Sequence, residues 1–150
     1  MNLKELKIKQ NNLKDIQIQL KQEFYGLDDV INQLIDTLRP WYLFNEAQTH
    51  PLVINLWGLT GTGKTSLIKR LIQLIDKEQA FFRFELDDVK NKDINTSLTN
   101  AIDVYEGEDY VICLDEFQHI RTIDQTGNET TNDLNFNLWD FIDTGTFEYK

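Results

Sequence analysis

The feature that most constrains this chain is a glycine-rich turn between a short apolar segment and an amphipathic one. The turn matches the pattern G-x-x-x-x-G-K-[ST] in full and reads Gly58-Leu59-Thr60-Gly61-Thr62-Gly63-Lys64-Thr65. It follows residues 52–57, an apolar run typical of a buried strand, and precedes apolar residues at helical spacing over residues 65–77. This order predicts a strand–turn–helix unit of an α/β sheet.

The residue types in this turn suit the binding of a phosphate chain. Glycines let the backbone approach closely and direct consecutive N–H groups at phosphate oxygens. The following helix places the positive end of its dipole at the same point. The expected phosphate-binding set is residues 58–66, in which Lys64 reaches the β- and γ-phosphates, the Thr65 hydroxyl binds Mg²⁺ and Ser66 lies beside them. A glycine-rich turn without a ligand is the alternative, and the flanking strand and helix favour the phosphate site.

A second motif follows about 50 residues later, where residues 110–114 predict a buried strand that ends in Asp115 and Glu116. Ligands of open α/β sheets bind at the C-terminal ends of the strands. We therefore expect Asp115 to hold Mg²⁺ through its water shell and Glu116 to polarise an attacking water. Two carboxylates that merely end a strand in solvent are the alternative, which the upstream turn makes the weaker one. Cys113, within this strand, is expected to be buried and inert.

Further segments complete the expected elements. Apolar residues spaced by three, four and seven predict a helix over residues 1–24, with a coiled-coil partner helix as the less favoured reading. A second helix is predicted to start at residues 27–29 and to end at Pro40. Residues 81–86 predict a strand, and shorter helices are expected over residues 98–105 and 134–142. Apolar strands alternating with helices indicate a three-layer α/β fold with a mainly parallel sheet.

Charge and composition exclude several classes of protein. The chain of 150 residues carries a formal net charge of −10, and residues 79–150 hold 16 acidic against five basic side chains. Such acidity argues against nucleic acid as the main partner, because phosphate binding needs a basic face. A single cysteine excludes an internal disulfide, and no apolar run is long enough to span a membrane. A soluble, cytoplasmic domain without a membrane anchor is expected.

The two motifs resemble those of the AAA+ branch of P-loop ATPases, which implies ATP and Mg²⁺ as cofactors, with Lys64 and Glu116 in catalysis. The segment Tyr25-Gly26-Leu27-Asp28-Asp29-Val30 looks like the family's stretch over the adenine, and by this resemblance Gly26 and Leu27 lie near the base. Residues 138–147 are similar to a stretch that follows the acidic motif in Clp-type unfoldases and torsin relatives. The aromatic-glycine pore loop of those unfoldases is not recognisable in residues 87–109. After the motif, Gln118 is expected either to contact the γ-phosphate region or to act on it through another residue. His119 is expected to lie at the surface or to form a hydrogen bond. Arg121 is expected at the surface, with an arginine finger acting in trans as the less favoured alternative.

The helix predicted from periodicity over residues 1–24 precedes the region of resemblance, which implies a partial nucleotide-binding domain over residues 25–150. The family's sensor strand, arginine finger and helical lid are not recognisable, so we expect an incomplete fold, either a fragment of a longer ATPase or a chain completed by another. The implied function is ATP hydrolysis that drives remodelling of a protein or nucleic-acid partner, within a homo-oligomer in the complete protein. A nucleotide-dependent switch or assembly module of the defence or signalling type, and a truncated piece that binds ATP without turnover, are the alternatives.

Overall fold

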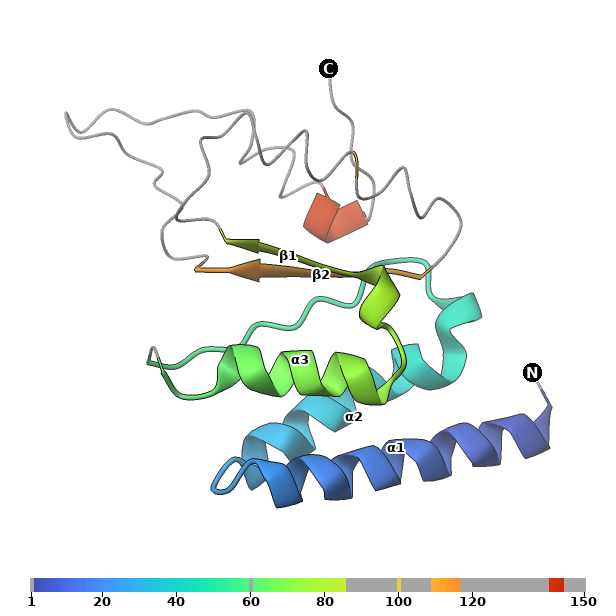
Figure 1. The fold of residues 1–150 in the computed structure, drawn as a ribbon. Coiled ribbons are helices and arrows are strands. Elements are labelled where there is room, and N and C mark those ends of the chain that lie inside the picture. Colours follow the sequence, from blue (N-terminus) through green and yellow to red (C-terminus); the bar gives the residue numbers. More distant parts are fainter. Residues whose placement is uncertain (1, 60, 86–99, 101–108, 117–140, 145–150) are drawn as a thin grey trace. The chain divides into compact units, whose positions relative to one another are not determined.

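The computed structural model of the chain describes residues 2–59, 61–85, 100, 109–116 and 141–144. Its elements are shown in Figure 1 and are, in order, α1 (Leu3–Glu23), α2 (Asp28–Phe44), the 3-10 helix η1 (Asn45–Ala47), α3 (Lys64–Leu74), the 3-10 helix η2 (Glu78–Ala80), β1 (Phe81–Glu85) and β2 (Val111–Asp115). Residues 141–144 are also helical. The chain divides into two compact units, Met1–Asp76 and Lys77–Lys150, and each is described by itself.

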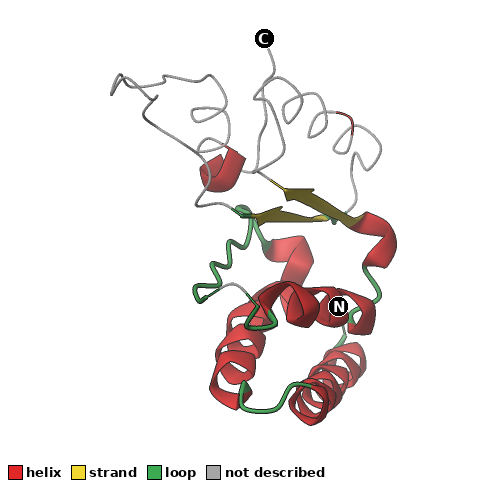
Figure 2. Cartoon of the chain, turned by 60° about the vertical axis from the view of Figure 1, so that its left-hand side comes forward, coloured by secondary structure: helices red, strands yellow, loops and turns green. Residues whose placement is uncertain are grey.

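The first unit has a core made by its three α-helices. Helix α1 contacts both α2 and α3 (Figures 1 and 2). Burying one leucine or isoleucine side chain contributes about 2 kcal/mol, so the apolar stripes of the helices hold the unit together. The buried side chains of this core are Leu13, Ile16, Leu20, Ile31, Leu34, Ile35, Leu38, Leu43, Leu67, Leu71, Ile72 and Ile75. The predicted helix over residues 1–24 is confirmed, and so is the helix after the glycine-rich turn, which ends three residues earlier than expected.

Local hydrogen bonds fix both ends of α1. The Asn2 side chain accepts hydrogen bonds from the backbone N–H groups of Lys4 and Glu5, and the Glu5 carboxylate accepts one from the Asn2 backbone N–H. This reciprocal pairing is a capping box, which satisfies backbone groups that lack partners within the helix. At the other end, Gly26 has a φ of 78°, the left-handed conformation that glycine adopts at little cost, and the chain turns there into α2.

The prediction that the second helix ends at Pro40 is wrong, because α2 continues through Pro40 to Phe44. Proline lacks the N–H that would bond to the carbonyl of Asp36, so one backbone bond is missing at this point. The helix nevertheless goes on to bury Leu43, which is 3% exposed. The free energy of burying this side chain offsets part of the cost of the lost bond.

The prediction of a buried strand over residues 52–57 is also wrong. These residues form neither helix nor strand, and no described strand pairs with them. Val53 is 44% exposed and Trp57 is 90% exposed. A strand exists only where its N–H and C=O groups pair with a neighbour, and apolar composition alone does not supply one.

The second unit contains the two expected strands of residues 81–86 and 110–114, observed as β1 and β2. They pair in parallel, with Phe81 opposite Val111 and Glu85 opposite Asp115. This pairing places the C-terminal ends of both strands at one edge of the small sheet. Cys113 is half-buried instead of fully buried as predicted. The predicted helix over residues 98–105 is described only at residue 100, and that over residues 134–142 only at residues 141 and 142, which are helical.

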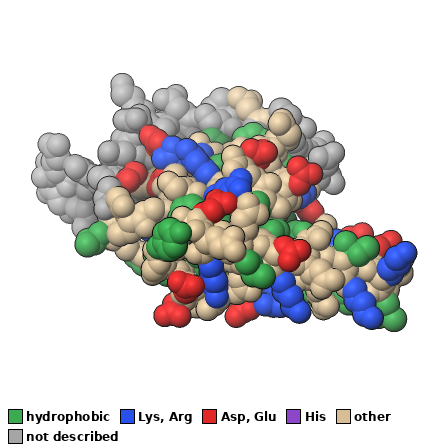
Figure 3. All heavy atoms as spheres, turned by 60° about the horizontal axis from the view of Figure 1, so that its bottom comes forward, with side chains coloured by type: hydrophobic (Ala, Val, Ile, Leu, Met, Phe, Trp, Pro, Cys, Tyr) green, Lys and Arg blue, Asp and Glu red, His purple; other side chains and the backbone are tan. Residues whose placement is uncertain are grey.

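Surface charges are mixed on the face that Figure 3 shows, where basic side chains lie among acidic ones and hydrophobic side chains are scattered between them. Among the described helices, none combines the length and the apolar character that a bilayer span requires.

Candidate functional site

The glycine-rich turn has backbone conformations that explain its glycines. Gly61 and Gly63 have φ values of 84° and 83°, and Gly58 has a φ of 155°. Residues other than glycine rarely adopt these backbone angles, because their Cβ atom would then crowd the backbone. Gly63 is also the N-cap of α3, so the turn leads directly into the helix. Thr60 lies outside the described residues.

Lys64 folds back onto the turn that precedes it. Its Nζ donates hydrogen bonds to the carbonyl oxygens of Gly58, at 2.9 Å, and Leu59, at 2.8 Å. Thr62 Oγ1 donates to the carbonyl of Leu59 at 2.8 Å and lies 3.5 Å from Nζ. The ammonium thus sits inside the curve of the turn, the position from which it can exchange carbonyl oxygens for phosphate oxygens.

The first turn of α3 favours an anion. It starts at Lys64 and contains no acidic side chain. The first N–H groups of a helix have no acceptor within the helix, and the dipole adds partial positive charge at this end. Thr65 is half-buried and Ser66 is exposed in this turn. The start of α3 therefore combines one cation with N–H groups that have no acceptor within the helix, a combination that suits an anion.

The acidic motif lies at the C-terminal end of β2. Asp115 is the last residue of the strand, and its Oδ1 accepts a hydrogen bond from the backbone N–H of Glu116 at 3.1 Å. Glu116 has a φ of 55°, in the left-handed region that costs a residue other than glycine about 1 kcal/mol. Such a strained conformation persists only where the surrounding structure maintains it, and it is more frequent at functional sites than elsewhere.

Arg83 on β1 contacts the acidic motif, and the sequence patterns did not single it out. Its Nε and Nη2 donate to Asp115 Oδ2 at 2.9 and 2.7 Å, and its Nη1 pairs with Glu85 Oε1 at 2.6 Å. The pKa of Arg83 is raised, first by the hydrogen bonds to Asp115, so the guanidinium stays charged. The sequence signal was a single arginine within the otherwise apolar start of the strand Phe81–Glu85. Its partner, Asp115, follows only from the register between β1 and β2.

The turn between α1 and α2 contains the residues that resemble an adenine-contacting segment. Gly26 is exposed there, Leu27 is half-buried, and the Tyr25 side chain is 90% exposed. The backbone N–H of Leu27 bonds to the carbonyl of Phe24 at 3.4 Å, which closes the turn. A ligand can therefore reach this turn from solvent.

The oxygen atoms available at the two motifs suit magnesium. Mg²⁺ prefers oxygen ligands and keeps several of its waters, so that one hydroxyl and one carboxylate are a sufficient protein contribution. Thr65 in the first unit carries such a hydroxyl, and Asp115 in the second unit carries such a carboxylate. Within the described part of the chain, no group of three or more His, Cys, Asp or Glu side chains forms a metal site of its own. Gln118, His119 and Arg121 lie outside the described residues.

Comparison with known proteins identifies the family. A family model described as an AAA domain matches residues 50–148. No curated protein and no solved structure gave a significant match. The matched range includes both the glycine-rich turn and the acidic motif, and it covers about two thirds of the chain. The helices and the small parallel sheet are compatible with an incomplete α/β P-loop fold. The chain therefore belongs to the AAA domain family of P-loop ATPases.

Proposed function

We propose that this chain binds Mg-ATP on residues 58–66 and hydrolyses it, with Asp115 and Glu116 completing the site. The observation that carries the proposal is the family match across both motifs, joined to a loop in which left-handed glycines lead into α3. Membership in the AAA family supports a nucleotide-dependent ATPase activity, and the glycine-rich turn and the acidic motif are the two segments expected to carry it.

Lys64 binds the phosphates in this proposal. Its three ammonium protons are shared now among acceptors of the turn itself, the carbonyls of Gly58 and Leu59. When a triphosphate enters, β- and γ-phosphate oxygens replace these carbonyls as acceptors. Hydrogen bonds between two charged groups are stronger than those to a neutral carbonyl, which gives the exchange its driving force.

Glu116 acts on the water in the proposed reaction. It accepts a hydrogen bond from the water whose oxygen attacks the γ-phosphorus, while the bond to the β–γ bridging oxygen breaks, leaving ADP and phosphate. Asp115 and the Thr65 hydroxyl would hold Mg²⁺, which supplies positive charge against the phosphates when it is bound. Lys64 stabilises the charge that develops on the transferred group.

The turn at Gly26 and Leu27 contacts the adenine in this proposal. The support is the resemblance of residues 25–30 to an adenine-contacting segment, together with the exposure of the turn. The base and the phosphates would then be bound by two segments of the first unit. The turn that follows α1 would bind the base, and the glycine-rich turn that precedes α3 would bind the phosphates.

The ATP cycle is proposed to drive the remodelling of a protein partner within a homo-oligomer. The net charge of −10 supports a protein partner over nucleic acid. Light scattering with and without ATP tests the oligomer, since nucleotide-dependent growth in mass is the expected result.

Three variants test the site. Lys64→Ala is expected to lower ATP affinity by at least about tenfold, because a charged hydrogen-bonding group is lost. Glu116→Gln is expected to keep the affinity and to lower the rate of hydrolysis by roughly 10² to 10⁴. Lys69→Ala is the matched control, because Lys69 is an exposed lysine of the same helix.

Each result has a distinct meaning. Full ATP affinity in Lys64→Ala would contradict the assignment of the phosphate site. If the wild type and Glu116→Gln both bind ATP and neither hydrolyses it, the motor function of this chain is contradicted, and the result fits either a nucleotide-dependent switch or a piece that binds ATP without turnover.

A further inference from the structure

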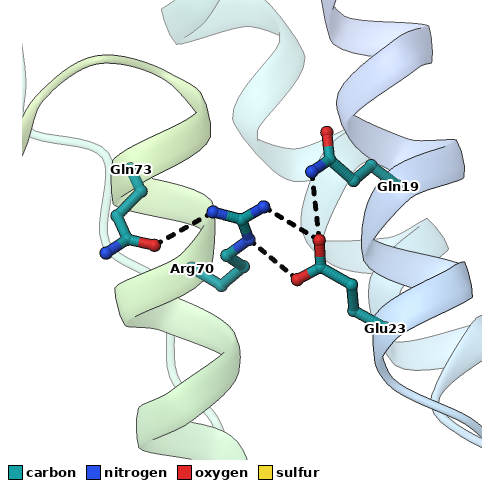
Figure 4. Close-up of polar contacts among 4 residues, drawn as sticks. All are labelled: Gln19, Glu23, Arg70 and Gln73. Atoms are coloured by element: carbon teal, nitrogen blue, oxygen red, sulfur yellow. Dashed lines mark hydrogen bonds and ion pairs between the residues drawn. The ribbon is translucent and has the colours of Figure 1, made fainter.

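A fork of hydrogen bonds joins α1 to α3, as Figure 4 shows. Arg70 Nε donates to Glu23 Oε2 at 2.7 Å, and Arg70 Nη2 donates to Glu23 Oε1 at 2.9 Å. Each partner is also held on its own helix, since Gln19 Nε2 donates to Glu23 Oε1 at 3.0 Å and Arg70 Nη1 donates to Gln73 Oε1 at 3.1 Å. Two charged side chains are thereby fixed in one geometry.

This pair has a better defined geometry than a typical surface ion pair. Both bonds run between planar groups in the parallel arrangement that gives arginine and carboxylate their specificity. The side chains of Arg70 and Glu23 are 32% and 36% exposed, so each is partly covered. The hydrogen bond from Arg70, followed by that from Gln19, lowers the pKa of Glu23.

The pair connects two segments with proposed roles in nucleotide binding. Glu23 is the last residue of α1, and the turn with Gly26 and Leu27 follows directly. Arg70 lies on α3, the helix that starts at Lys64. Because a helix rises about 1.5 Å per residue, Arg70 is about 9 Å along the axis from Lys64. Fixing Arg70 to Glu23 therefore fixes the turn relative to the start of the helix.

We propose that Glu23 and Arg70 are positioning residues that hold the α1–α2 turn at the spacing at which one ATP molecule meets both the turn and the phosphate-binding loop. This inference rests on the proposed function, in which the turn contacts the base and Lys64 the phosphates. Neither Glu23 nor Arg70 touches the nucleotide. Their contribution is the alignment of two contact regions that must bind one ligand simultaneously.

Comparing the affinities for ATP and inorganic tripolyphosphate separates positioning of the turn from a general weakening of the fold. Tripolyphosphate engages only the phosphate-binding loop, so its affinity does not depend on where the turn lies. In Arg70→Gln, the dissociation constant of ATP is expected to rise about tenfold, while that of tripolyphosphate changes by less than about twofold. Glu23→Gln is expected to behave in the same way. Both affinities are measured by calorimetry on the full chain with Mg²⁺ present.

Two further variants sharpen the comparison. The double exchange Glu23→Arg with Arg70→Glu restores the pair in reverse and is expected to recover most of the ATP affinity. Arg39→Gln is the matched control, because Arg39 forms an exposed ion pair with Asp36 within α2 alone. Circular dichroism on every variant checks that the helices are retained.

The outcomes distinguish the inference from the function on which it rests. An unchanged ATP affinity in both Arg70→Gln and Glu23→Gln would overturn the inference, and so would equal losses for ATP and tripolyphosphate. If Lys64→Ala weakens both ligands while the pair variants weaken neither, the phosphate site stands and only the inference fails. If Lys64→Ala binds both ligands as well as the wild type, the proposed function itself fails. Should Arg70→Gln not fold, Glu23→Gln, which keeps the shape of the side chain, gives the answer.

Discussion

Arg83 donates two hydrogen bonds to a single carboxylate oxygen of Asp115, from Nε at 2.9 Å and from Nη2 at 2.7 Å. The two residues lie on neighbouring parallel strands, and Arg83 stands opposite Cys113, two positions before Asp115. The guanidinium also pairs with Glu85, so one cation lies between two carboxylates at the C-terminal edge of the sheet. Asp115, the residue proposed to bind Mg²⁺, is thus oriented by a fixed positive charge.

Replacing this arginine is expected to destabilise the sheet modestly. Arg83→Gln leaves Asp115 and Glu85 without their shared cation and should lower the free energy of unfolding by up to about 1 kcal/mol, as for other partly exposed ion pairs. Glu85→Gln removes one of the two carboxylates and should cost less. Urea denaturation measures both. Since the Debye length is about 3 Å at 1 M salt, the loss in Arg83→Gln should shrink there, and a loss independent of salt would contradict an electrostatic origin.

Stability is expected to fall in acid through Glu23. The hydrogen bonds from Arg70 and Gln19 lower its pKa in the folded chain below the usual glutamate value. A lowered pKa means that the stabilisation is complete above the unfolded pKa and is lost as the pH falls through the folded one. The urea midpoint of the wild type should therefore decrease as the pH falls below the ordinary glutamate pKa of about 4.3. Glu23→Gln should show a shallower decrease than Glu46→Gln, a control on the exposed helix η1.

Elements defined by local periodicity were predictable from the sequence. The spacing of apolar residues such as Leu13, Ile16 and Leu20 predicted α1, and these side chains are buried as expected. The strands β1 and β2 were predicted to within one residue at each end. For α1 the residues that decide the structure are neighbours in the sequence, so their pattern is sufficient, whereas the two strands also depend on pairing with each other.

Features that depend on distant residues were not predictable. Residues 52–57 have the composition of a strand, but pairing depends on a neighbour that no local pattern specifies. The same holds for Arg83, whose contact with Asp115 follows from strand register, and for Arg70, which lies 47 residues from Glu23 in sequence. At the candidate site, the motif spacing predicts which residues act on the nucleotide, and this stays a prediction. The hydrogen bonds from Lys64 to the carbonyls of Gly58 and Leu59 followed from no sequence pattern and are seen only in the structure.

Removing the proline from α2 is expected to stabilise the first unit. Pro40 is exposed, so little packing is lost in Pro40→Ala. Alanine restores the N–H that can bond to the Asp36 carbonyl, and it is the better helix former by about 3 kcal/mol at an interior position. A more flexible unfolded chain and a backbone already adapted to proline reduce the net gain to about 1 kcal/mol. The unfolding midpoint should rise, whereas Pro51→Ala in the irregular segment should leave it unchanged or lower it. A destabilised Pro40→Ala would show that the proline contributes to packing.

The backbone of the glycine-rich turn gives a prediction that separates the effect of strain on stability from its effect on the proposed phosphate binding. Gly63 and Gly26 have φ values of 83° and 78°, and a Cβ at either position meets no atom within 4 Å. Alanine at either site therefore costs backbone strain alone, about 1 kcal/mol in each case, and asparagine at residue 63 costs less because it tolerates this conformation. Urea denaturation should show equal losses for Gly63→Ala and Gly26→Ala. Tripolyphosphate affinity, in contrast, should fall only in Gly63→Ala, because Gly63 precedes Lys64 in the loop and Gly26 lies in the turn before α2. Equal tripolyphosphate losses in both variants would mean that strain acts through global stability and not through the shape of the loop.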